Sequence, residues 1–266
     1  MKIRYVVSSM VFWWRENHLS FEQDCGFLKS LGFGIELWPN AGGISECRYA
    51  RHNWARLANA TKGMLVSMRS RSDEPTLEHW KEQIECAKML GANIVTNLRS
   101  FGVLEDSEID GSDFSEKVVQ IADENKVKLC IETGSLKTLK EVGKKFDSIS
   151  YCFDAGFAYL DPEFSFKQYV DELASRIAHL HLTDNYGQID DHEPPGLRGG
   201  IPREDWSYLL GTLNEYDNEV IGSLEMSPCT PAVMIRKACE FLFDELKWPH
   251  RPQKQPSYAS ATYNPP

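Results

Sequence analysis

The sequence predicts a single α/β domain that closes into a (β/α)8 TIM barrel. Short apolar runs with the character of strands alternate with amphipathic helical segments along almost the whole chain. Eight such pairs occur in 266 residues, which is a usual size for this barrel. No Gly-x-Gly-x-x-Gly motif follows the first strand-like run, so an open, doubly wound sheet is the less favoured alternative.

The elements follow one another at short intervals. We expect strands at residues 3–7, 34–37, 64–68, 93–98, 127–132, 150–154, 179–182 and 220–225. We expect helices at residues 21–31, 48–60, 77–90, 114–124, 136–146, 166–178, 206–216 and 232–246. The helix at 77–90 is the clearest, because Thr76 can cap it, apolar side chains recur every three or four residues, and Gly91 ends it. The barrel is predicted to span residues 1–247, and residues 248–266 are predicted to form an extended or disordered arm.

Composition limits the partners of this protein. A formal charge of −10 and an isoelectric point near 5.2 disfavour binding to nucleic acid or to an anionic membrane. Seven scattered cysteines form no Cys-x-x-Cys pair, and there is neither a signal-like segment nor a long apolar stretch. We therefore expect a cytoplasmic protein with reduced thiols that acts on a small molecule. A homo-oligomer is compatible with the sequence.

Charged side chains end several of the predicted strands. Glu132, Asp154 and Glu225 end the apolar fifth, sixth and eighth strands, and His181 ends the seventh. A barrel carries its active site at these carboxyl ends, so the four side chains should converge. Three carboxylates together repel one another unless a cation neutralises them. This donor set favours one Mn²⁺, Mg²⁺ or Co²⁺ ion, with Zn²⁺ as a less favoured choice. Each residue taken singly could instead cap a helix or meet water.

Further polar residues lie at the same predicted edge. The candidates for substrate contacts are Glu36, Arg69, Arg99, Asp184, His192 and Arg198. The arginines can clamp a phosphate or carboxylate, although pairing with surface acids is the favoured role for Arg198. Asp184 serves equally well to orient the loop after the seventh strand.

Two other groups of residues at this edge have equally plain structural roles. His179 is expected to be a packed barrel residue rather than a ligand. Trp13, Trp14 and Trp38 suit either a sugar-binding wall or simple packing.

Several short motifs together resemble one known family. They are GIELW at the second strand, IETGS at the fifth, FDAGFA at the sixth, HLHLTDN with the later DDH and PPG at the seventh, and SLEMSP at the eighth. Over residues 1–246 the chain resembles the xylose-isomerase-like barrels, which include sugar-phosphate isomerases and epimerases and, more distantly, apurinic endonucleases. The resemblance implies one divalent metal held by Glu132, Asp154, His181 and Glu225.

The chain also departs from that family. Phe157 stands where many members carry a histidine that contacts substrate or an extra metal. Arg69 and Arg99 stand where the endonucleases carry histidines, although Asp190 and His192 survive as a remnant of DDH. With the acidic isoelectric point, these departures disfavour a role in DNA repair.

The resulting expectation is a metal-dependent isomerase or epimerase of a sugar or sugar phosphate that acts through an enediolate. Glu132 and Glu225 are the expected catalytic residues, one removing and the other returning a proton. One alternative is a dehydratase of a polyol or keto acid on the same metal. The other, motivated by Phe157, is a degenerate barrel that binds a sugar without turnover.

Overall fold

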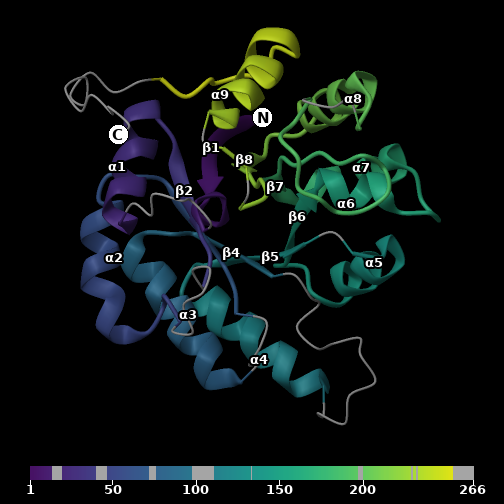
Figure 1. Ribbon diagram of the computed structural model, residues 1–266. Helices are drawn as coiled ribbons and strands as arrows, with labels where there is room; N and C mark the ends of the chain where they lie inside the picture. The colour runs from purple at the N-terminus through teal and green to yellow at the C-terminus, as the bar shows by residue number, and fades with distance from the viewer. Residues whose placement is uncertain are drawn as a thin grey trace.

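The computed structural model describes residues 1–13, 20–39, 47–71, 76–97, 111–132, 134–196, 200–228, 230–231 and 233–253. Eight parallel strands pair in chain order and β1 closes on β8, which confirms the predicted barrel. The strands are β1 Lys2–Ser8, β2 Gly34–Leu37, β3 Val66–Arg69, β4 Ile94–Asn97, β5 Lys128–Glu132, β6 Ser150–Asp154, β7 Ile177–His181 and β8 Glu219–Leu224. Helices surround these strands (Figure 1).

The helices follow the predicted pattern with one addition. They are α1 Phe21–Leu31, α2 Trp54–Thr61, α3 Leu77–Leu90, α4 Gly111–Glu124, α5 Leu136–Lys145, α6 Ala155–Leu160, α7 Phe166–Leu173, α8 Arg203–Leu213 and α9 Met234–Cys239. The added helix is α6, whose six residues are too few to show a helical period. Asp154 caps it by accepting a hydrogen bond from the Phe157 N–H. None of the described helices is long and apolar enough to cross a membrane.

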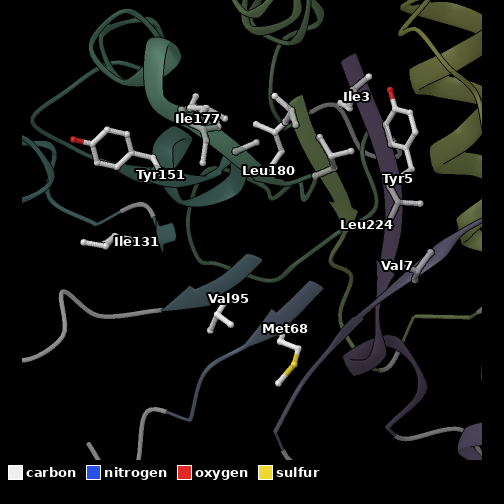
Figure 2. Packing of buried hydrophobic residues seen from close by; sticks show 14 of the residues in the cluster. Ile3, Tyr5, Val7, Met68, Val95, Ile131, Tyr151, Ile177, Leu180 and Leu224 are labelled. Carbon is white, nitrogen blue, oxygen red and sulfur yellow. The ribbon is translucent and has the colours of Figure 1, made fainter. Parts of the chain in front are cut away.

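The barrel has one apolar core outside the strands and a small one inside. Alternate residues of β1, namely Ile3, Tyr5 and Val7, belong to the large core that also takes in the apolar sides of the helices (Figure 2). The small inner cluster has another composition: it consists of Val6, Ile94, Cys130, Cys152, Ala178 and Ile221. Because this cluster is small, most of the barrel interior is left for polar side chains.

The chain remains packed past the last helices. A π-helical turn, Glu240–Glu245, follows α9, and Trp248 is only 3% exposed. The hydroxyl of Tyr5 donates to the carbonyl of Pro249 at 2.9 Å. The first residues of the predicted arm therefore contact the barrel, and its remainder, 254–266, lies outside the described residues.

Tyr49 ties together the ends of β2 and β3, and this contact gives a stability test. Its buried hydroxyl lies 2.5 Å from the carbonyl oxygen of Leu37 and 2.7 Å from that of Arg69. Tyr49→Phe should lower the free energy of unfolding by about 1–3 kcal/mol, because the one buried O–H hydrogen that the two carbonyls share is lost. Urea unfolding measures this change. Tyr208→Phe, which removes an exposed hydroxyl from Asp171, is the control and should change stability by less than about 0.5 kcal/mol. Equal effects would contradict the assignment.

Candidate metal centre

Four acidic and imidazole side chains meet at the carboxyl end of the barrel. Glu132 ends β5, Asp154 ends β6, His181 ends β7, and Glu225 follows β8 directly. One ligand atom from each lies within 4.8 Å of the others, and all four side chains are buried. The strand ends that the sequence singled out thus come together in one place.

The two ring nitrogens of His181 face different groups. Nδ1 lies 2.7 Å from Glu132 Oε1, 2.5 Å from Glu225 Oε2 and 3.5 Å from Asp154 Oδ2. Nε2 faces Glu36 Oε1 at 3.2 Å. Burial opposes a positive charge on the ring, but Cys152 and the three glutamates outweigh it and raise the pKa of His181 well above its usual value. Without a metal, a protonated imidazole thus serves as the counter-ion of the carboxylates.

Arg69 neutralises one of these carboxylates from the end of β3. Its two terminal nitrogens donate to the two oxygens of Glu132 at 2.8 and 2.6 Å, and both side chains are buried. Burial would raise the pKa of Glu132, but Arg69 and His181 lower it to about 2. The Arg69 guanidinium also lies over the ring of Trp38, 4.7 Å from its centre. This arginine, predicted to contact substrate, is therefore engaged by a candidate ligand.

The donor set fits one divalent cation. The three carboxylate ligands and Arg69 carry two net negative charges when the imidazole is neutral, and Glu36 beside the same ring adds to them, so a divalent ion would offset most of this charge. Glu225 Oε2 is buried and makes no hydrogen bond of suitable geometry among the described residues, although His181 Nδ1 lies 2.5 Å from it. A buried oxygen that is paired in charge but not hydrogen-bonded is suited to metal coordination. Oxygen ligands with one imidazole suit Mg²⁺, Mn²⁺ or Zn²⁺.

The loop after β7 is held against the site by Asp184. Its two carboxylate oxygens accept hydrogen bonds from the backbone N–H groups of Asn185, Gly196 and Ile201 at 2.8 to 3.0 Å. Burial raises the pKa of Asp184, and the three N–H donors oppose that rise. Gly200 must be glycine, since a Cβ there would lie 1.4 Å from the carbonyl oxygen of Asn185. Asp184, predicted to contact substrate, orients this loop.

The remnant of DDH lies on the same loop and close to the cluster. His192 Nε2 is 3.4 Å from Asp190 Oδ2. Burial lowers the pKa of His192, but Glu225, Asp154 and Asp190 raise it above its usual value overall. Its Nδ1 is buried without a hydrogen-bond partner among the described residues. A substrate contact by His192 stays a prediction.

Aromatic residues lie around the same end of the barrel. Trp13 and Trp38 pack edge to face with their ring centres 5.4 Å apart. Phe157, on the first turn of α6, is 39% exposed. Trp14, Arg99 and Arg198 lie outside the described residues.

The polar layer beneath the cluster was not predicted. His179 Nδ1 contacts Cys152 Sγ at 3.3 Å and its Nε2 contacts Ser67 Oγ at 3.1 Å, in keeping with a packed role. Burial lowers the pKa of His179 to about 4, so it is neutral. Cys152, His179 and His181 also lie close enough to bind a metal, although their hydrogen bonds already satisfy the first two. The sequence signal that could have predicted this polar layer is the presence of small hydroxyl residues, such as Ser67, inside apolar strands.

A separate cavity lies at the opposite end of the barrel. It has a volume of about 640 Å³ and is lined by residues of the amino ends of β1 and β2, by Lys62 and by His250. None of the candidate ligands lines it. Two of its lysines, Lys29 in the last turn of α1 and Lys62 directly after α2, lie where cations commonly offset the helix dipole.

Comparison with known families agrees with this geometry. The family model of the xylose isomerase-like TIM barrel matches residues 50–245. The chain belongs to the xylose isomerase-like TIM-barrel family. No curated protein shows a significant sequence match.

Solved structures of similar barrels share the whole domain. The IOLI protein, solved with a zinc atom, is 16% identical with a TM-score of 0.63, covering 92% of this chain and 98% of its own. An L-ribulose 3-epimerase is 17% identical with a TM-score of 0.59, covering 90% and 86%. The probable 3-DHS dehydratase AsbF of Bacillus anthracis is 14% identical with a TM-score of 0.61, covering 90% and 98%. At these identities the likeness shows the fold.

The predicted ligand set is tested by removing its imidazole. His181→Ala should reduce bound metal from about one ion per chain toward zero, because it removes one of four ligands and leaves three carboxylates crowded. Metal at a hundredfold excess over its dissociation constant should stabilise the wild type by about 2.7 kcal/mol and the variant hardly at all. Elemental analysis and thermal unfolding with and without metal measure both effects.

The control for this test is His52→Ala, which changes an exposed histidine on the outside of the barrel. It should keep the metal content and the metal-dependent stabilisation. Unchanged metal in His181→Ala would contradict the ligand set, and two or three ions per wild-type chain would contradict a single-metal site.

Proposed function

We propose that this protein is a metal-dependent isomerase or epimerase of a sugar or sugar phosphate. The observation that carries the proposal is the convergence of Glu132, Asp154, Glu225 and His181 at the carboxyl end of a barrel of this family. A similar barrel that is an L-ribulose 3-epimerase supports the substrate class. The zinc atom in another similar barrel supports a divalent metal.

In the proposed reaction, a proton is removed next to a carbonyl and returned to an adjacent position or to the other face. A bound divalent cation would stabilise the negative charge of the enediolate as a Lewis acid. Glu132, Asp154, His181 and Glu225 would hold it. Two glutamates near one carbon would exchange the proton, one as base and the other as acid.

Glu132 and Glu225 differ in ways that bear on these roles. Arg69 holds both oxygens of Glu132, so this carboxylate is ionised and fixed in orientation. Glu225 Oε2 has no hydrogen-bond partner among the described residues, so it is available to accept a proton or to bind metal. Both side chains are buried, so the reacting carbon would be handled by these carboxyl groups rather than by bulk water.

A dehydratase is the second candidate, because one similar barrel is a probable 3-DHS dehydratase. It would use the same metal and the same proton abstraction but would eliminate water from a polyol or keto acid. Product analysis separates the two reactions, since elimination gives a conjugated carbonyl that absorbs ultraviolet light. A barrel that binds sugar without turnover would give neither product nor solvent exchange.

The two-glutamate mechanism is tested in D₂O. Glu132→Gln and Glu225→Gln should each reduce turnover by about 10²- to 10⁴-fold, because each removes an acid–base group. A single variant of an epimerase that still holds metal should exchange the substrate hydrogen from one face without inverting the centre. Mass spectrometry of the recovered substrate and product measures deuterium.

The matched control is Glu219→Gln, at the opposite end of β8, where Glu219 forms a solvent-exposed salt bridge with Lys2. It should leave turnover and exchange unchanged. Conversion by the wild type without deuterium uptake would contradict the mechanism even if all four ligands bind the metal, because hydrogen would then move within the substrate.

Whether the substrate is anionic depends on the remaining arginines. Arg69 is occupied by Glu132, so Arg99 is the stronger candidate for binding a phosphate or carboxylate. Arg99→Met should raise KM for a sugar phosphate or sugar acid by roughly 10- to 100-fold, the value of a charge-assisted hydrogen bond, and for a free sugar far less. The control is Arg56→Met, which removes an exposed arginine of α2 that pairs with Glu22 of α1. Equal increases for both substrate classes would identify Arg99 as structural.

A further inference from the structure

Glu36 is a carboxylate buried inside the barrel at β2. Its side chain is fully shielded from solvent. Oε1 accepts a hydrogen bond from Thr96 Oγ1 at 3.2 Å, and Oε2 accepts one from Ser223 Oγ at 2.7 Å. These partners come from β4 and β8, so the carboxylate is held from both sides of the barrel. Glu36 contacts the ring of His181 on the side opposite Nδ1, and its predicted contact with substrate stays a prediction.

Glu36 is completely enclosed by the barrel and is held by hydroxyl groups on two other strands. Replacing a buried polar or ionic group by apolar side chains often leaves stability unchanged or increased. Barrel stability alone therefore gives no reason for a glutamate here, and its contact with His181 gives one.

The contact determines which nitrogen of His181 carries hydrogen. The hydroxyl groups of Thr96 and Ser223 already donate to the two oxygens of Glu36, so Nε2, at 3.2 Å from Oε1, is placed as a third donor to the same carboxylate. A neutral imidazole has a single N–H, so its lone pair is then on Nδ1. That nitrogen faces Glu132, Asp154 and Glu225.

We propose that Glu36 is a positioning residue that holds His181 in the orientation and tautomer that present Nδ1 to the metal. The proposal rests on the metal centre of the proposed function and is independent of the substrate. Partners of this kind fix the ring of a ligating histidine and make it more basic. Glu36 contacts neither the metal nor the substrate in this role.

Metal affinity tests the proposal without reference to turnover. Glu36→Leu should weaken zinc binding by about 10- to 100-fold, measured by competition with a chromophoric chelator, because the ring loses its acceptor. Glu36→Gln keeps an amide oxygen as acceptor without the charge, and should recover part of this loss. Ser67→Ala is the matched control: it removes a partner of His179 from the same layer and leaves the contact between His181 and Glu36 in place.

A second measurement needs no change at Glu36 and decides the case even if Glu36→Leu does not fold. In the zinc-loaded wild type labelled with ¹⁵N at histidine, the ring signals of His181, identified by their loss in His181→Ala, should show zinc on Nδ1 and hydrogen on Nε2. Zinc on Nε2, or affinity within twofold of wild type in both Glu36 variants, would overturn the proposal and leave the metal centre standing. A wild type that binds no divalent metal would overturn both.

Discussion

The organisation of this site depends on the repulsion among carboxylates enclosed in a barrel. Glu132, Asp154 and Glu225 approach one imidazole nitrogen, and Glu36 faces the other nitrogen of the same ring. Negative charges this close in a shielded interior are stable only with positive charges among them. Arg69 and a protonated His181 supply these without a metal. A divalent cation bound to Nδ1 of His181 would replace the proton on that nitrogen, so the metal and the proton compete for it.

The layers of the barrel interior explain how such a cluster is built on a stable fold. Side chains alternate along each strand, so the residue two positions before a terminal carboxylate also points into the barrel. In β5 and β6 this residue is a cysteine. Cys130 lies below Glu132 and Cys152 below Asp154, and these cysteines belong to the small apolar cluster. Beside these cysteines, His179 contacts Cys152 and Ser67. The hydroxyl groups of Thr96 and Ser223 donate hydrogen bonds to Glu36. The ionic groups are thereby supported without reaching the large core outside the strands.

Similar barrels include an epimerase and a probable dehydratase, so the fold by itself does not choose the reaction. In this chain Arg69 binds Glu132, and the edge-to-face pair of Trp13 and Trp38 lies beside it. Phe157 is exposed on the first turn of α6, directly after the candidate ligand Asp154.

The barrel and the four candidate ligands followed from local sequence patterns. Eight apolar runs predict eight strands, and the polar residues that end them predict a common edge, because parallel strands place all their carboxyl ends together. Local patterns do not specify which charged groups become partners across the barrel. Arg69 hydrogen-bonds to Glu132, 63 positions away, and Glu36 contacts His181 across 145 positions, and neither pair was predicted. The order and closure of the strands bring these pairs within hydrogen-bond distance. Because an unpaired charge in the interior costs far more free energy than one in water, each buried group needs its partner.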